Sequence, residues 1–262
     1  MTARILLVGL DPPETDPIVE RVEARCVVHP ALPRIKVVEG RLLTQGPSSV
    51  AFVEIDKVVF HGIFADDFDF LCGLALWGGP CFPDAMAMMD CRLKLPGLIR
   101  ASRVSRFGAA ARGFAGRGTR LKAEAETVAK WGNWHCGEDK ARFTGDFEAQ
   151  EATWFEPFFT GQAVRVVAIG QRHWQIRLGG EGWLKSIHHA DADFMALDPE
   201  LLEDTLRLRA HFGLDLIGVD YIVGDDGHKH LLEVNHIPSV TCFAEIRQAW
   251  LDQVTEWIDR PA

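Results

Sequence analysis

The most constraining feature of the sequence is a pair of apolar runs that flank Asp226-Gly227. They lie in the segment LIGVDYIVGDDGHKHLLEVNHIP, residues 216–238. Asp-Gly is a preferred pair for a two-residue hairpin turn, so this segment predicts two antiparallel strands. With that turn, Asp225 faces His228 and Asp220 lies directly opposite Glu233.

Three oxygen-bearing side chains then share one face of the hairpin. Directly opposed residues have Cβ atoms roughly 5 Å apart, and Asn235, two residues beyond Glu233, points to the same side. Two carboxylates that close repel each other unless a cation lies between them. Oxygen ligands with room for water suit Mg²⁺ that is bound through substrate phosphates. Asp220, Glu233 and Asn235 are therefore candidate metal ligands.

An ordinary hairpin with three solvated polar residues is the alternative. We favour it less because Glu233 and Asn235 stand in an apolar run. The apolar residues of that run are Leu231, Leu232, Val234 and Ile237.

Bulk properties exclude several classes of protein. The 262 residues suffice for one large domain or two or three lobes, and the net charge of -9 disfavours a nucleic-acid-binding surface. No apolar run approaches the roughly 18 residues of a membrane span, and the N-terminus does not resemble a signal peptide. The 6 cysteines include no CxxC pair, which favours reduced thiols in the cytoplasm over a zinc site.

The first 85 residues alternate between strand and helix patterns, which predicts a small α/β lobe with parallel strands. We expect a helix over 16–24, with Asp16 as its cap and Pro17 at its first position. A second helix is expected over 66–78. The expected strands cover 4–10, 26–29, 49–55 and 57–64.

The rest of the chain predicts a helical stretch over 86–101 that Pro96 interrupts, then a turn-rich segment over 107–118. A strand, a glycine loop and a second strand follow over 126–143. The clearest helix covers 198–213, because Asp198 suits its N-cap and Gly213 its end. A last helix is expected within 239–258.

The hairpin resembles the metal motif of the ATP-grasp superfamily, in which Asp, Glu and Asn hold Mg²⁺ on ATP. Glutathione synthetase, the protein glutamate ligases and synapsin belong to it. VAKWGNWHCGEDKARF, FEPFFTGQAVRVVAIG and IRLGGEGWLKSIHH resemble successive family segments in the right order, so the likeness covers about 84–258. It implies an α/β (α+β) ATP-grasp fold: a Rossmann-like N-terminal lobe over 1–85 and an ATP-grasp domain over 86–262. Within that domain a lid subdomain covers about 105–158 and a C-terminal subdomain with an antiparallel sheet about 159–262.

The resemblance also implies roles for individual residues. Lys130 would reach the ATP phosphates beneath a loop from Gly132 to Gly137, with Lys140 as a further phosphate or lid contact. An earlier phosphate ligand is Arg92 or Lys94, and Lys94 is favoured. The hinge around adenine would comprise Glu156, Pro157 and Phe158. Catalytic cations near the transferred phosphoryl would be Arg165, Arg177 and Lys185.

Each of these residues also has a plain structural explanation. Lys130 could be a surface lysine at a strand end, and either arginine could belong to a structural ion pair. The aromatic residues around Phe158 could simply form a buried cluster. His236, beside Asn235, could touch substrate, but a satisfied loop histidine is the simpler interpretation.

Two departures from the family pattern concern fine positioning. The acidic residue that often precedes the arginine after the hinge, and contacts the ribose, is absent from Gln162-Ala163-Val164-Arg165. The asparagine that often follows the basic residue near 185 is replaced by Ser186-Ile187. The ribose contact therefore stays unassigned.

The resemblance implies a carboxylate–amine ligase that uses ATP and Mg²⁺, with Mn²⁺ as an alternative ion, and proceeds through an acyl phosphate. Its partners would be small-molecule or peptide carboxylates and amines, not nucleic acid or membrane, and a homodimer is one option. A kinase on the same scaffold and a non-catalytic ATP-binding protein of the synapsin kind remain open. Retention of Asn235 beside both carboxylates favours catalysis.

Overall fold

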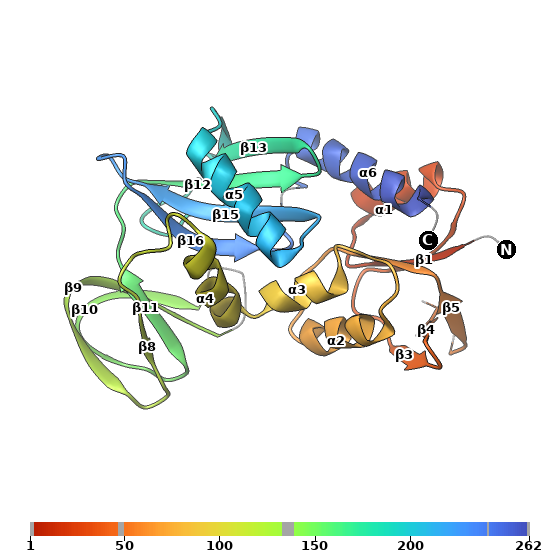
Figure 1. Ribbon diagram of the computed structural model, residues 1–262, viewed down its shortest axis with the longest axis horizontal. Coiled ribbons are helices and arrows are strands. Elements are labelled where there is room, and N and C mark those ends of the chain that lie inside the picture. Colours follow the sequence, from red (N-terminus) through yellow and green to blue (C-terminus); the bar gives the residue numbers. More distant parts are fainter. Residues whose placement is uncertain (1–2, 47–49, 133–138, 240, 261–262) are drawn as a thin grey trace.

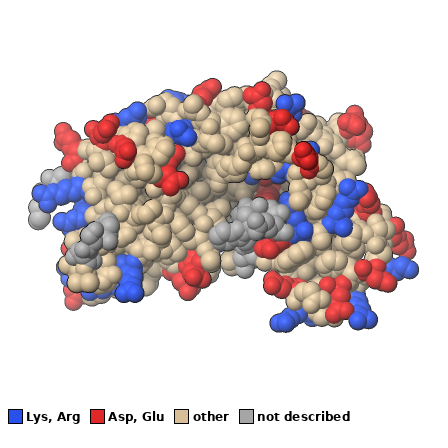
Figure 2. Space-filling view, turned by 180° about the vertical axis from the view of Figure 1, so that it is seen from behind, with Lys and Arg blue, Asp and Glu red and all other residues tan. Residues whose placement is uncertain are grey.

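The computed structural model describes residues 3–46, 50–132, 139–239 and 241–260. The described strands form four sheets, with the β8–β11 sheet (within 113–157) and the β3–β5 sheet (within 35–55) at opposite ends of the molecule (Figure 1). No described helix is both long and apolar enough to cross a bilayer. In Figure 2 acidic and basic side chains are interspersed around the visible face, and the described residues form no continuous basic band there.

A parallel sheet of order β2-β1-β6-β7 forms the core of the N-terminal region. Its strands are β1 (Arg4–Val8), β2 (Arg25–His29), β6 (Lys57–Phe60) and β7 (Cys81–Phe82). The predicted parallel lobe is confirmed for β1, β2 and β6, whereas β7 was not predicted. The expected strand over 49–55 belongs elsewhere: β5 (Phe52–Ile55) joins β3 (Ile35–Val38) and β4 (Arg41–Gln45) in a separate antiparallel sheet.

Helix α1 (Pro12–Arg21) begins four residues before the predicted start. Asp11, not Asp16, is its N-cap residue, and the backbone N–H groups of Glu14 and Thr15 donate to the Asp11 carbonyl. Two consecutive prolines suit the first positions because their missing N–H groups would have no helical partner there. Pro17 therefore lies inside the helix. Helix α2 (Asp67–Trp77) forms as predicted.

Two helices connect the parallel sheet to the rest of the molecule. They are α3 (Ala85–Arg92) and α4 (Lys94–Val104), and the break falls at Leu93, whose backbone is extended. Pro96 does not cause the break at its own position, because it lies in the first turn of α4, where proline is tolerated.

The central sheet is antiparallel, with the order β10-β9-β11-β8. It comprises β8 (Gly113–Ala115), β9 (Arg120–Trp131), β10 (Lys140–Glu148) and β11 (Thr153–Pro157). Its small core contains Ala129 and Phe155, with the rings of Phe143 and Phe147 packed against them. This sheet extends away from the other three in Figure 1.

The largest sheet is antiparallel, with the order β14-β13-β12-β15-β16. Its strands are β12 (Gln162–Ile169), β13 (Arg172–Arg177), β14 (Asp193–Met195), β15 (Leu216–Val223) and β16 (Lys229–Asn235). One face packs on α5 (Pro199–Phe212), whose predicted cap Asp198 and terminating Gly213 are confirmed. The other packs on α6 (Ala244–Asp259) and the N-terminal lobe.

Candidate functional site

The hairpin of β15 and β16 brings the predicted metal ligands together. Asp220 pairs directly with Glu233, as the sequence predicts, and Asn235 pairs with Gly218. The turn itself differs from the prediction: Gly224, not Asp225, faces His228, and Gly227 lies in the left-handed region with φ 81°. The loop therefore has three residues with a glycine at the left-handed position, a common hairpin geometry.

A bulge at Leu232 explains why Asp220 pairs with Glu233 as predicted, although the turn was predicted one residue out of place. Tyr221 pairs with Leu231 and Asp220 with Glu233, so Leu232 is an extra residue on β16. The one-residue error at the turn and the one-residue bulge cancel. The bulge also frees the Leu232 carbonyl, which accepts a hydrogen bond from Lys130 Nζ at 3.1 Å. Bulges of this kind are frequent beside active sites.

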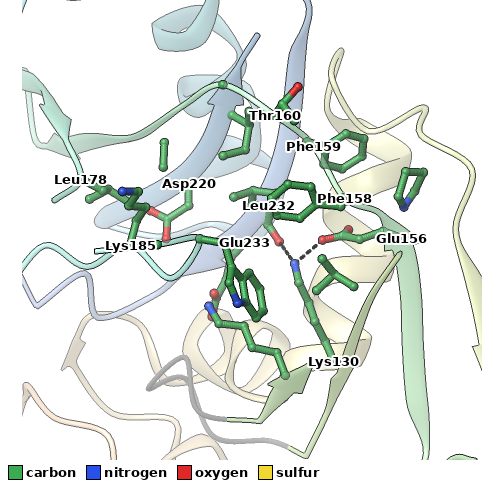
Figure 3. A pocket seen from close by; sticks show the side chains of 18 of the residues that line it. Lys130, Glu156, Phe158, Phe159, Thr160, Leu178, Lys185, Asp220, Leu232 and Glu233 are labelled. Atoms are coloured by element: carbon green, nitrogen blue, oxygen red, sulfur yellow. Dashed lines mark hydrogen bonds and ion pairs between the residues drawn. The ribbon is translucent and has the colours of Figure 1, made fainter. Parts of the chain in front are cut away.

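A cavity of about 290 Å³ lies between the central sheet and the large sheet, and it collects most of the predicted nucleotide residues (Figure 3). Predicted residues that line it are Lys94, Lys130, Lys140, Glu156, Pro157, Phe158, Lys185, Asp220 and Glu233. Its volume is at the lower end of the range for small-molecule sites.

The walls of this cavity are aromatic and aliphatic on the hinge side. Phe158 and Phe159 follow β11, and Trp183 approaches from the loop after β13, with ring centroids of Trp183 and Phe158 6.3 Å apart. Sequence reasoning missed Trp183; the signal was a large aromatic residue directly after the glycines at 179, 180 and 182. Such walls suit the faces of a purine ring.

Glu156 lines the cavity, but its carboxylate forms ion pairs with two cations, Lys130 and Arg112. Its Oε1 lies 2.5 Å from Lys130 Nζ, and its Oε2 lies 3.2 Å from Arg112 Nε. Its side chain is only 1% exposed. The sequence placed Glu156 in the hinge and missed its partner Arg112, which comes from the turn-rich segment. Glu156 can therefore orient Lys130, while Pro157 and Phe158 remain at the hinge.

Three lysines meet near the hairpin carboxylates. Burial lowers the pKa of Lys140, the Glu233 carboxylate opposes this shift, and Lys130 and Lys94 reinforce it. Such a cluster of amines is the arrangement that a polyphosphate neutralises.

The structure also separates Lys94 from Arg92. Arg92 Nε donates to Asp67 Oδ1 in a buried ion pair, and Arg92 also bonds the Phe64 carbonyl. Lys94 lines the cavity and Arg92 does not.

A second cavity, of about 390 Å³, adjoins the first and reaches the N-terminal lobe at Ile63. The two cavities share five lining residues: Lys140, Leu178, Lys185, Asp220 and Glu233. Residues that line only the second include Arg165, Asn235, Ser186, His188 and Ser239. The amine of Lys185, at their junction, donates to the Gly180 carbonyl at 2.6 Å.

The two predicted catalytic arginines lie on opposite faces of the large sheet. Arg165 shares a face with Ala163 and Val167, which pack toward α6, and it contacts Asp220. Arg177 alternates with Ile176 and Leu178, which lie on that same α6 face, so it points to the other side. Arg177 is exposed, bonds the Asp191 carbonyl and lines neither cavity. It therefore does not meet the other site residues.

Asp220, Glu233 and Asn235 fit a divalent cation. They offer carboxylate and amide oxygens, the ligand type that Mg²⁺ takes. Asn235 is 5% exposed, and its Nδ2 has no hydrogen-bond partner among the described residues. A buried donor left without a partner costs about 1–3 kcal/mol, and an acceptor such as a phosphate oxygen would satisfy it. His236 is fully buried and lines neither cavity.

The predicted glycine loop lies largely outside the described residues, since it includes 133–138.

Comparisons with known proteins show a likeness in structure alone. No family model and no curated protein matches the sequence. D-alanyl-alanine synthetase A from Vibrio cholerae is similar over 98% of this chain and 96% of its own, with 14% identity and a TM-score of 0.69. The fold is the ATP-grasp fold.

Other ATP-grasp structures match nearly the whole chain as well. A RiPP-associated ATP-grasp ligase from Chryseobacterium gregarium, in complex with ADP and a leader and core peptide, covers 99% of this chain with 98% of its own. Its identity is 11% and its TM-score 0.63. Macrocyclase MdnC from Microcystis aeruginosa, bound with precursor peptide MdnA, covers 97% of this chain with 98% of its own, at 13% identity and a TM-score of 0.61. The ATP-grasp fold thus accounts for the entire chain.

Proposed function

We propose that this chain is an ATP- and Mg²⁺-dependent ligase that joins a carboxylate to an amine through an acyl phosphate. One observation supports this most directly: the hinge cavity and the second cavity share Asp220 and Glu233 in their walls. A nucleotide in the first cavity would place its terminal phosphate where a second substrate could reach it.

In this proposal the first cavity holds the nucleotide. Phe158 and Trp183 line the end of the cavity that takes the base. The carbonyl oxygens of Pro157 and Phe158 would accept from its edge, since Pro157 has no N–H and the Phe158 N–H donates to the Glu126 carbonyl at 2.9 Å. Lys130, oriented by Glu156, contacts the phosphates together with Lys94 and Lys140. These side chains hold the phosphates in line and offset their charge, which is most of what phosphoryl transfer requires of a protein.

Asp220, Glu233 and Asn235 would hold Mg²⁺, or Mn²⁺ in its place. The ion, when bound, offsets the negative charge that the phosphates bring to the two carboxylates. Lys185, at the junction of the cavities, would add positive charge beside the phosphoryl that is transferred.

The second cavity would take the carboxylate and the amine. Two of the similar proteins, the RiPP-associated ATP-grasp ligase and macrocyclase MdnC, hold peptides in their structures, which supports an amino-acid-like or peptide substrate here. We further propose the lobe boundaries given above, with 1–85 as the N-terminal lobe and 86–262 as the ATP-grasp domain, and a cytoplasmic location, where ATP is supplied.

The test is an ADP-release assay with MgATP and a panel of amino acids and short peptides, each supplied with and without a primary amine. ADP release that requires both a carboxylate and an amine, with an amide product by mass spectrometry, would support the ligase. A phosphorylated product without an amine would indicate a kinase instead. Tight ATP binding without turnover on any pool would rule out both enzymes.

Glu233→Gln is the matched variant for this assay. It should abolish Mg²⁺-dependent ADP release while the circular dichroism spectrum stays that of the wild type, because the amide keeps the shape but loses the charge. Asp225→Asn, at the exposed tip of the same hairpin, should keep full activity. Normal turnover in Glu233→Gln would remove the metal assignment.

A further inference from the structure

Arg165 binds the carboxylate of Asp220, one of the proposed metal ligands, through two nitrogens of its guanidinium. Its Nε lies 2.6 Å from Asp220 Oδ1 and its Nη2 lies 2.8 Å from Asp220 Oδ2. The two residues are direct partners on β12 and β15, so the backbone register holds them together. A third bond, from Nη1 to the Pro238 carbonyl at 2.7 Å, fixes the guanidinium plane.

The sequence around Asp220 makes room for this contact. A Cβ added at Gly218 would lie 2.6 Å from Pro238 Cβ and 3.4 Å from Arg165 Cδ. Any larger residue at 218 would therefore push against the arginine and against the proline whose carbonyl it bonds. Gly218 lies two residues before Asp220 on β15, on the same face of the sheet.

The pair is nearly buried, and it faces a second carboxylate. The side chains of Arg165 and Asp220 are 12% and 11% exposed. Asp220 also lies opposite Glu233 on the neighbouring strand. Burial by itself lowers the pKa of Arg165, but the charge and hydrogen bonds of Asp220, together with the charge of Glu233, more than reverse this, so the guanidinium stays charged. Without the charge of the guanidinium, the carboxylates of Asp220 and Glu233 would lie close together with little water around them, which is unfavourable.

We propose that Arg165 is the resident counter-cation of the metal site, so that the free protein binds a divalent cation weakly and takes one up together with the nucleotide. The inference rests on the proposed metal role of Asp220. An arriving cation competes with the guanidinium for the Asp220 oxygens and is repelled by its charge. The phosphates of a nucleotide supply the negative charge that offsets this repulsion. Arg165 is thus a positioning residue for Asp220.

The test measures Mn²⁺ binding by electron paramagnetic resonance, with and without ADP, in the wild type and in Arg165→Gln. In the wild type Mn²⁺ should bind at least tenfold more tightly when ADP is present. In Arg165→Gln the affinity of the nucleotide-free protein should rise at least tenfold, because both oxygens of Asp220 then face the ion without the guanidinium bound to them.

Thermal unfolding supplies a second readout that does not depend on turnover. Arg165→Gln should unfold at a lower temperature than the wild type in EDTA and recover most of the loss in Mn²⁺. The double variant Arg165→Gln/Asp220→Asn should regain stability in EDTA and lose the gain in Mn²⁺ affinity. Arg92→Gln, which breaks the buried pair with Asp67, should lose stability without recovery in Mn²⁺.

Two results would overturn the inference: equal Mn²⁺ affinity of nucleotide-free wild type and Arg165→Gln, or tight binding by the nucleotide-free wild type. These are separate from the proposed ligase activity. If no substrate pool supports ADP release but Arg165→Gln gains Mn²⁺ affinity, the ligase fails and the counter-cation stands. If ADP does not raise Mn²⁺ affinity in either protein, the shared metal–nucleotide site itself is wrong.

Discussion

Glu156 lies between two buried cations, and this placement makes it a central charge of the candidate site at the scale of single residues. Its carboxylate bonds Lys130 on β9 and Arg112 on the segment that leads into β8. The same guanidinium of Arg112 donates to the Leu231 carbonyl at 2.6 Å. One carboxylate therefore links the hinge, Lys130 and the hairpin of β15 and β16.

Glu156→Gln should destabilise the protein by roughly 3 kcal/mol, because it leaves two buried cations without their counter-charge. Urea unfolding at neutral pH measures this. Glu126→Gln is the control, since it breaks the more exposed pair with Arg142 and should cost less than about 1 kcal/mol. Equal losses in the two variants would mean that Glu156 is not a buried counter-ion.

His61 gives the stability a pH dependence. Its ring packs on Trp250 with centroids 4.9 Å apart, and its Nδ1 is buried without a hydrogen-bond partner among the described residues. Burial lowers the pKa of His61 to about 4, and the Asp11 carboxylate offsets part of that shift.

Below its ordinary pKa of about 6.5, the unfolded chain takes up a proton at His61 that the folded chain refuses. The folded state should therefore lose stability as the pH falls from about 6.5 to about 4, by up to roughly 3 kcal/mol from this group. His61→Phe should flatten that part of the profile in urea unfolding between pH 7 and pH 5. His211→Gln, at an exposed position of α5, should leave it unchanged. Identical slopes in wild type and His61→Phe would contradict the assignment.

At the scale of elements, the segment between β11 and β12 determines how the central sheet joins the large one. Gly161 has φ 139°, and a Cβ there would lie 2.3 Å from the Val223 carbonyl oxygen. The hinge therefore passes directly against Val223, the last residue of β15. Asp220 lies on the same strand. The resemblance to ATP-grasp proteins indicated this hinge, but the close approach depends on the strand across from it.

Gly161→Ala should cost more than about 2 kcal/mol, since it combines a strained backbone with a clash against a backbone atom. Differential scanning calorimetry would measure the change. Gly40→Ala is the matched control, because Gly40 also has a positive φ, of 72°, but nothing lies within 4 Å of its Cβ position. That variant should lose about 1 kcal/mol. A Gly161→Ala protein as stable as Gly40→Ala would show that the hinge has room.

At the scale of the whole molecule, the N-terminal lobe is fastened to the large sheet through α6. Lys57 on β6 donates to the carbonyls of Trp257 at 3.4 Å and Ile258 at 2.6 Å, and to that of Arg260. Glu14 of α1 pairs with Arg247 at 3.3 Å. The hydrophobic cluster around Trp250 spans both regions as well. The second cavity therefore has its N-terminal wall held in place.

Lys57→Met should lower the free energy of unfolding by about 2 kcal/mol, because the last carbonyls of α6 lose a charged donor. It should also speed the cleavage of the N-terminal lobe in limited proteolysis, since fewer contacts then hold it to α6. Lys122→Met, on an exposed position of β9, should change neither quantity. Unaltered proteolysis of Lys57→Met would show that the apolar contacts alone join the lobes.

The sequence by itself determined the features that depend on local rules. A turn signal and the alternation of strands placed Asp220 opposite Glu233, and capping residues bounded α5. The order of lysine, hinge and metal segments sufficed for the ATP-grasp fold. The predicted pairing of Asp220 with Glu233 was right although the predicted turn was wrong, because the bulge at Leu232 shifts the register back by one residue. No local sequence pattern predicts such a bulge.

Tertiary structure alone decided how the charges pair. It joined Arg165 to Asp220 across 55 positions and Arg112 to Glu156 across 44, and it turned Arg177 to the far face of the sheet. It also brought Trp183 against the hinge and left Lys94, rather than Arg92, beside the cavity. Ion pairs of this kind depend on which strands become neighbours, and that choice is made by the packing of the whole core rather than by any segment.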